Sequence, residues 1–153
     1  MCLRPYPIKA LTSGDIDLAR AMNMLFASVF DMHDDYARKP PSDTYLRKAL
    51  ANNAVIAMVA LDANALVGAI TAYELVKLEQ ERSEIYIYDL AVEAAHRRRG
   101  IATSLIRSIQ AEAEKRGAWV VYVQADWQDE IPVRLYSKLG VREDVHHFDL
   151  PVR

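Results

Sequence analysis

Cysteine, an excess of positive charge and long apolar runs are all missing or nearly missing from this sequence. Cys2 is the only cysteine among the 153 residues, so no disulfide can form within the chain. No apolar run reaches the roughly 20 residues that a membrane-spanning helix requires. The first residues, MCLRPYPIKALTSGD, also lack the apolar stretch of a secretion signal. We therefore expect a cytoplasmic protein that has no membrane as a partner.

The charges of the chain nearly cancel. The sequence has 19 Lys and Arg against 21 Asp and Glu, which gives a formal net charge of -2. This balance provides no broad positive surface for a phosphate backbone, so we expect no nucleic acid as a partner. Hydrophobic residues make up 52% of the chain, and its length suits one globular domain. We expect that single domain to cover residues 1–153.

Two spacings of apolar residues alternate along the chain. Aliphatic or alternating segments predict strands at residues 6–11, 54–62, 65–75, 83–93, 119–126 and 141–150, the second and third forming a hairpin. Helical spacing predicts helices after Asp15, after Asp43, from Ile101 to Gly117 and around residues 132–139. The charged, proline-containing residues 31–43 indicate a loop. The order of elements favours an α/β fold with one mixed sheet flanked by helices.

The segment SEIYIYDLAVE, residues 83–93, is typical of a central strand. Because side chains alternate along a strand, we expect Ile85, Ile87 and Asp89 on one face. The opposite face would then carry Glu84, Tyr86, Tyr88 and Leu90. This pattern places a carboxylate inside an otherwise apolar strand.

A basic loop, His96 to Thr103, follows this strand and begins the next helix. A helix start leaves backbone N–H groups unpaired and carries the positive end of the helix dipole, so it can bind a pyrophosphate. Small residues at Gly100 and Ala102 would let phosphates approach these donors, and arginines would add charge-assisted hydrogen bonds. The plainer alternative is a solvated basic helix start.

Arg97, Gly100 and Ala102 match the pattern [RQ]-x-x-G-x-[GA], and the loop resembles the coenzyme A pyrophosphate loop of the GNAT acetyltransferase superfamily. The resemblance covers almost the whole chain and implies acetyl-CoA as cosubstrate. The coenzyme-binding residues that it implies are Leu90, Ala91, Val92, Arg97, Arg98, Arg99, Gly100, Ile101, Ala102 and Thr103. Members of the superfamily often dimerise, so a homodimer is a further expectation.

Within the superfamily, the blocks RSEIYIYDLAV, HRRRGIATSLI, VYVQAD, LYSKLG and HFD are most similar to the gentamicin-type aminoglycoside 3-N-acetyltransferases. This resemblance implies acetylation of a polycationic amine substrate and resistance to the antibiotic. A polycation needs carboxylates in its site. Our candidates are Glu84, Asp126, Asp129, Glu130 and Asp149, and the loop after the first helix offers Asp31, Asp34 and Asp35 as well. The QAD block favours Asp126, whereas an ordinary surface charge is the better explanation for any one of the others.

Acetyl transfer to an amine requires a base for the ammonium proton and a donor for the thiolate. We assign the base to Asp89, directly or through a water, although a structural acid would occupy the same position. The resemblance implies Tyr136 as the donor to sulfur, where a tyrosine packed between helix and sheet is the alternative. A main-chain N–H near Leu90 or Val92 would stabilise the carbonyl.

Direct transfer in a ternary complex is preferred, because Cys2 is a poor candidate for a covalent intermediate. His146 and His147 lack partners at metal-ligand spacing, so we expect no metal site. Two other functions remain open at this stage. The chain could be a GNAT acetyltransferase for a polyamine or protein amine, or a non-catalytic acyl-CoA-binding module.

Overall fold

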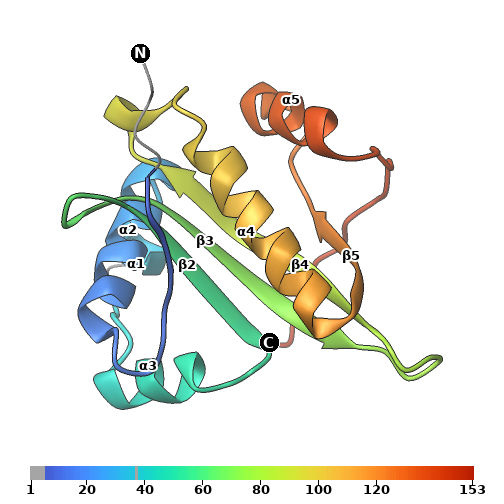
Figure 1. Ribbon diagram of the computed structural model, residues 1–153, viewed down its shortest axis with the longest axis horizontal. Helices are drawn as coiled ribbons and strands as arrows, with labels where there is room; N and C mark the ends of the chain where they lie inside the picture. The colour runs from blue at the N-terminus through green and yellow to red at the C-terminus, as the bar shows by residue number, and fades with distance from the viewer. Residues whose placement is uncertain (1–5, 37) are drawn as a thin grey trace.

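The computed structural model describes residues 6–36 and 38–153, and Cys2 lies outside this range (Figure 1). Its sheet has five strands in the order β1-β2-β3-β4-β5, which are β1 (Ile8–Ala10), β2 (Val55–Asp62), β3 (Ala65–Val76), β4 (Ser83–Val92) and β5 (Ala118–Val123). The pairs from β1 to β4 are antiparallel, whereas β4 and β5 are parallel. The predicted mixed sheet and the hairpin of β2 and β3 are therefore confirmed.

Helices cover both faces of the sheet. The α-helices are α1 (Ile16–Phe30), α2 (His33–Tyr36), α3 (Asp43–Leu50), α4 (Ile101–Arg116) and α5 (Glu130–Leu139), and a 3-10 turn, η1, spans Ala94–His96. In Figure 1, α4 crosses the near face of the sheet, and α1 to α3 lie behind it. Gly117 ends α4 in the left-handed conformation (φ 71°), as the sequence predicts. No helix of the described part of the chain is long and apolar enough to cross a membrane.

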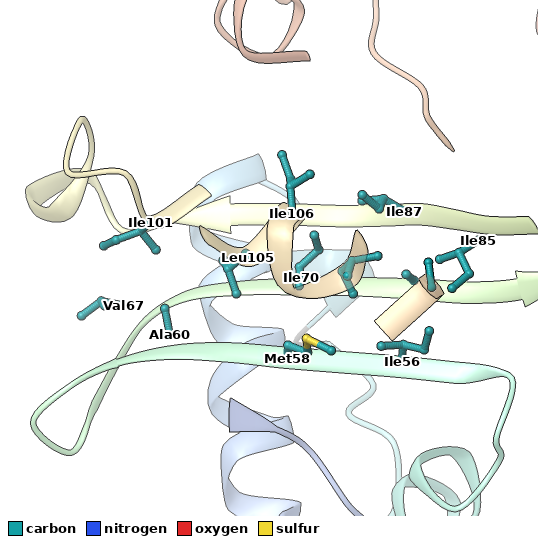
Figure 2. Packing of buried hydrophobic residues seen from close by; sticks show 13 residues of the cluster. Ile56, Met58, Ala60, Val67, Ile70, Ile85, Ile87, Ile101, Leu105 and Ile106 are labelled. Carbon is teal, nitrogen blue, oxygen red and sulfur yellow. The ribbon is translucent and has the colours of Figure 1, made fainter. Parts of the chain in front are cut away.

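The described residues form two hydrophobic clusters, and the larger of these packs α4 onto the sheet (Figure 2). Leu105 and Ile109 of α4 are fully buried against aliphatic side chains of β2, β3 and β4. Gly68 of β3 lies beneath the start of α4, where a Cβ atom would be 2.7 Å from Ile101 Cγ2. The absence of a side chain at Gly68 thus allows the first turn of α4 to pack closely on the sheet.

Two predictions about elements are wrong. Residues 141–150 form no strand: the chain after Gly140 has neither helix nor strand and is exposed throughout. Residues 31–43 are not only a loop, because α2 lies within them. Three boundaries also differ, since β1 is shorter than predicted, β5 ends at Val123, and α5 begins at Glu130.

The predicted faces of β4 are also wrong beyond Ile87. The pairing of β3 with β4 shifts between Thr71 and Ala72, which oppose Asp89 and Ile87, so Tyr88 is an extra residue in a β-bulge. The bulge reverses the alternation that follows it. Leu90 therefore packs on the α4 side, together with Ile87, whereas Asp89 lies on the side of α1 and α2.

Candidate active site

The two parallel strands of the sheet separate next to the bulge. β4 and β5 are paired from Ser83, opposite Ala118, to Ile87, opposite Val123. Beyond Ile87, β4 continues to Val92 and pairs only with β3. The backbone groups of β4 that face away from β3 are therefore free of strand pairing from Tyr88 onward. A substrate group that enters between the strands could bind these backbone donors and acceptors.

Asp89 is held at this point by two hydroxyl groups. Tyr36 of α2 donates a hydrogen bond to Asp89 Oδ1 (2.8 Å), and Thr71 of β3 donates to Oδ2 (3.1 Å). Burial raises the pKa of the Tyr36 phenol well above its ordinary value, and the bond to Asp89 adds to this effect. Tyr36 thus remains a donor at every ordinary pH. Each carboxylate oxygen of the half-buried Asp89 retains capacity for a further donor.

Four tyrosines extend from Asp89 across the same face of the sheet. Tyr88 meets Tyr73 and Tyr86 edge to face, with ring centroids 5.9 and 5.7 Å apart, and Tyr86 stacks on Tyr122 at 4.9 Å. The Tyr86 hydroxyl donates to Gln124 Oε1 (3.0 Å) just beyond β5. We call Tyr73, Tyr86, Tyr88 and Tyr122 the tyrosine platform. Its rings offer apolar faces and negative π-electron density beside a carboxylate.

On the other face of the sheet, β4 leads through η1 into the basic loop. Gly100 precedes α4 in the left-handed conformation (φ 81°), and a Cβ atom there would meet nothing within 4 Å. Within the described residues, the backbone N–H groups from Arg98 to Thr103 have no hydrogen-bond partner, and Ser104 is the first to donate to an earlier carbonyl. This loop therefore presents unpaired donors around an open space.

Arginine side chains tie the same loop to its surroundings. Arg97 Nε donates to the carbonyl oxygen of Val92 (3.3 Å), which fixes the loop to the end of β4. Arg99 donates to the Tyr6 hydroxyl (3.2 Å). Arg98, in a left-handed conformation at φ 61°, is exposed. Each guanidinium has five N–H donors, so these contacts leave others available to an anion.

Tyr136 lies on the α4 side of the sheet, opposite Asp89. Its ring packs against the larger hydrophobic cluster, and burial raises the pKa of its phenol to about 12. The structure thus places the two predicted catalytic residues on opposite faces of the sheet, with Asp89 beside the region where β4 and β5 are unpaired. A substrate group that both side chains contact would therefore lie between β4 and β5.

These features agree with the similarity of the whole chain to known proteins. The Acetyltransferase (GNAT) family model matches residues 22–141. The chain belongs to the GNAT acetyltransferase family. This GNAT protein is an enzyme that uses acetyl-CoA as acetyl donor, and it is homologous to aminoglycoside acetyltransferases. Among curated proteins, none matches it significantly.

Two solved structures are similar enough to support a family relationship. Aminoglycoside acetyltransferase HMB0005, from an uncultured soil metagenomic sample, is 45% identical over 98% of this chain and 100% of its own, with a TM-score of 0.96. Aminoglycoside acetyltransferase meta-AAC0020, also from an uncultured soil metagenomic sample and in complex with sisomicin, is 31% identical over 96% of each chain, with a TM-score of 0.89. A ribosomal-protein-alanine N-acetyltransferase from Brucella melitensis, at 22% identity, covers 97% of this chain and 99% of its own; its TM-score of 0.76 shows the fold alone.

The basic loop fits the pyrophosphate of the GNAT cosubstrate. Its unpaired N–H groups and the space above Gly100 could accept phosphate oxygens, and nearby arginines supply positive charge. Ile101 does not face this space, because its side chain is buried in the core. Ile101 can therefore contact the pyrophosphate only through its backbone N–H.

None of the other predicted carboxylates shares a hydrogen-bond partner with Asp89 among the described residues. Glu84 lies five residues before Asp89 on β4, about 16 Å away at roughly 3.3 Å per residue, and it accepts a hydrogen bond from Trp119 Nε1 (3.2 Å). Asp126 and Asp129 are exposed in the turn between β5 and α5, where the Asp129 N–H donates to the Asp126 carbonyl oxygen (3.0 Å). Glu130 pairs with Arg134 (2.9 Å).

Asp149 contacts His147 at 3.0 Å in the exposed residues after α5. No hydrogen bond joins any of these five acids to Asp89 in the described part of the chain. Glu84, Glu130 and Asp149 are already engaged by other side chains, whereas the carboxylates of Asp126 and Asp129, in the turn after β5, form no ion pair with the described residues.

Sequence reasoning did not find Tyr36 or Thr71 as partners of Asp89. Thr71 is one of the few buried polar side chains, and its position opposite Asp89 depends on the bulge. The platform had a visible signal, because Tyr86 and Tyr88 alternate along the strand that contains Asp89. Among described residues, no group of three His, Cys, Asp or Glu side chains could hold a metal ion.

Proposed function

We propose that this enzyme transfers the acetyl group of acetyl-CoA to the 3-amino group of an aminoglycoside, by direct transfer in a ternary complex, and so confers resistance. The main observation is the juxtaposition of Asp89, held by Tyr36 and Thr71, with the tyrosine platform at the point where β4 and β5 separate. The relative that is 31% identical was crystallised in complex with sisomicin, which supports an aminoglycoside as acceptor.

Asp89 acts as the base in this proposal. An ammonium group must lose a proton before its nitrogen can attack a thioester. The Tyr36 and Thr71 hydroxyls each occupy one lone pair of the carboxylate and fix its orientation, which leaves the remaining lone pairs for the ammonium or a bridging water. The proton passes from the amine to Asp89 and then to solvent, which restores the carboxylate.

The tyrosine platform binds the rest of the acceptor. Aromatic rings pack against the apolar faces of sugar rings, and they attract ammonium groups through cation–π interactions. Tyr88 is the most exposed member and is adjacent to Asp89. Asp126, in the turn between β5 and α5, contributes a second carboxylate to a further ammonium group of the polycation.

The coenzyme side consists of Leu90 to Val92, the loop from Arg97 to Thr103, and Tyr136. The backbone of β4 beyond the bulge is unpaired on the β5 side, so the N–H near Leu90 or Val92 can donate to the thioester carbonyl. The phenol of Tyr136 stays protonated because burial raises its pKa to about 12, and it can donate to the departing sulfur.

Acetyl-CoA consumption measured against gentamicin, kanamycin, sisomicin and spermidine tests this proposal, with the acetylated nitrogen located by NMR. We expect turnover of at least one aminoglycoside with a kcat/KM well above that for spermidine, and acetylation of the 3-amino nitrogen. Turnover of spermidine alone would contradict the aminoglycoside assignment. Acetylation at another ring nitrogen would contradict only the position.

A further inference from the structure

Trp127 presents its indole ring to solvent in the turn that joins β5 to α5 (Figure 1). The Asp129 N–H donates to the carbonyl oxygen of Asp126 (3.0 Å) and closes a four-residue turn in which Trp127 is the second residue. Trp127 is 72% exposed and belongs to neither hydrophobic cluster. Packing of the core therefore does not explain a large aromatic ring at this position.

A cation already lies over the face of this ring. The guanidinium carbon of Arg142 is 4.4 Å from the centroid of the Trp127 ring, which is within the range of a cation–π interaction. Arg142 belongs to the segment after α5, two residues beyond Gly140. The flanking carboxylates of Asp126 and Asp129 form no ion pair with the described residues. The turn thus offers an aromatic face and two carboxylates to a positive charge.

A second tryptophan of the chain also has an arginine over its ring, and that pair is firmly held. The guanidinium carbon of Arg82 is 3.9 Å from the centroid of the Trp119 ring. Arg82 also pairs with Glu79 at 2.8 Å, and its side chain is only 23% exposed. Trp119 Nε1 donates to Glu84 at 3.2 Å. Both members of this pair are therefore fixed by further contacts.

The pair of Arg142 and Trp127 is held at fewer points. The Arg142 side chain is 49% exposed, and its ion pair among the described residues is with Asp144, two positions along the same segment. This contact leaves the guanidinium free to leave the ring without breaking a bond to another element. Another cation can therefore replace Arg142 more easily than it could replace Arg82.

The turn begins beside the tyrosine platform. The Tyr86 hydroxyl donates to Oε1 of Gln124, the first residue after β5, at 3.0 Å. Trp127 follows three residues later, so its Cα atom lies within about 11 Å of the Gln124 Cα atom, at ~3.8 Å per residue. An acceptor that extends from Asp89 across the platform would reach this turn next.

We propose that Trp127 determines specificity for the acceptor: its indole face binds an ammonium-bearing ring of the aminoglycoside, and Arg142 occupies that face until the substrate displaces it. This inference rests on the proposed function, and it favours acceptors long enough to extend from Asp89 to the turn. An ammonium group that replaces Arg142 restores the cation–π contact, and Asp126 pairs with its charge. A substrate bound at Asp89 presents its other amines at a high local concentration, so it can compete with the tethered guanidinium.

Substitution of the two partners should change the KM for sisomicin in opposite directions. Trp127→Ala removes the ring and should raise this KM about fivefold, with kcat unchanged. Arg142→Ala removes the internal competitor and should lower the KM about threefold. The double variant should have the KM of Trp127→Ala alone, because Arg142 would have no ring to cover. A KM that rises in Arg142→Ala, or that stays unchanged in Trp127→Ala, would overturn the proposal.

Arg82→Ala is the matched control, since it removes the corresponding arginine from the other tryptophan. We expect the KM for sisomicin to be the same in this variant and in the wild type. If the KM falls as much in Arg82→Ala as in Arg142→Ala, the loss of any positive charge has the same effect. That result would also overturn the proposal.

Fluorescence tests the binding of sisomicin at Trp127 without any turnover. Trp119→Phe leaves Trp127 as the only tryptophan, and Trp127→Phe leaves Trp119. With coenzyme A present, which carries no acetyl group, sisomicin should protect Trp127 from quenching by acrylamide in a saturable way and should not protect Trp119. Calorimetric titration of the same proteins measures the binding of sisomicin independently.

The two readouts distinguish failure of this inference from failure of the proposed function. Protection of Trp127 in an enzyme that acetylates no aminoglycoside would refute the proposed function and leave the binding site at Trp127 supported. Binding of sisomicin without protection of Trp127 would overturn the inference, whether or not the enzyme acetylates the compound. Absence of sisomicin binding would overturn the inference as well.

Discussion

The hydroxyl of Tyr36 donates a hydrogen bond to Asp89 Oδ1 at 2.8 Å, across 53 positions of sequence. This bond joins α2 to the bulge of β4. It couples a short helix in a charged segment to the carboxylate that we propose as the base. The geometry of the base therefore depends on the region around α2 as well as on the sheet.

Tyr36→Phe tests this dependence. The ring would keep its packing against Phe26 and Phe30, while the carboxylate would lose one of its two fixed donors. We expect kcat to fall by about tenfold, because a misplaced base is costly and a hydrogen bond to a charged group is worth ~1.5–3 kcal/mol. The KM for acetyl-CoA should not change. An unchanged kcat would show that Tyr36 does not position Asp89.

Replacement of Tyr88 tests the tyrosine platform. Tyr88→Ala removes an exposed ring beside Asp89 and should raise the KM for an aminoglycoside by about tenfold, since cation–π and stacking contacts are each worth roughly 1 kcal/mol. Tyr45→Ala is a matched control, because Tyr45 on α3 has the same 63% exposure as Tyr88 but lies outside the platform. Equal effects of the two substitutions on KM would count against the platform.

Two glycines allow a matched test of the coenzyme loop. Gly100 and Gly117 both have a positive φ, and a Cβ atom at either would meet nothing within 4 Å. Valine at either position should therefore cost similar stability, about 1–2 kcal/mol. Only Gly100→Val should weaken acetyl-CoA binding, by at least about tenfold, because its side chain would occupy the space above the unpaired N–H groups. Calorimetric titration that gives wild-type affinity for Gly100→Val would exclude the loop as the pyrophosphate site.

The pH dependence of kcat should not depend on Tyr136. Burial disfavours the phenolate and raises the pKa of Tyr136 to about 12, so the phenol remains protonated between about pH 6 and pH 10. Tyr136→Phe should lower kcat by about a hundredfold through loss of a donor, with the shape of the pH profile unchanged in this range. An alkaline decline present in the wild type and absent from Tyr136→Phe would mean that Tyr136 titrates there.

Long periodic segments were predicted well from the sequence because their pattern repeats. The hairpin of β2 and β3, the strand β4 and the helix α4 with its end at Gly117 all follow from apolar spacing. The bulge at Tyr88 leaves no such signal, since one extra residue in a strand changes register without changing composition. The faces of Asp89 and Leu90 were therefore predicted incorrectly.

Other parts of the site depend on contacts between distant segments. Charges and prolines conceal the short α2 in the sequence, so Tyr36 could not be connected with Asp89. Residues 141–150 have a strand pattern but find no strand partner among the described residues. Local pattern indicates what a segment can form, whereas its partner is decided by the tertiary or quaternary structure.

Asp89→Asn tests the central claim most directly, with kcat measured at saturating acetyl-CoA and an aminoglycoside that the wild type acetylates. The amide keeps the size of the carboxylate but cannot accept the ammonium proton, so kcat should fall by roughly 10²–10⁴-fold. Asp126→Asn is the comparison: it should chiefly raise the aminoglycoside KM, because that carboxylate is assigned only to binding. A kcat for Asp89→Asn within about twofold of the wild type would contradict the account, whatever the effect on KM.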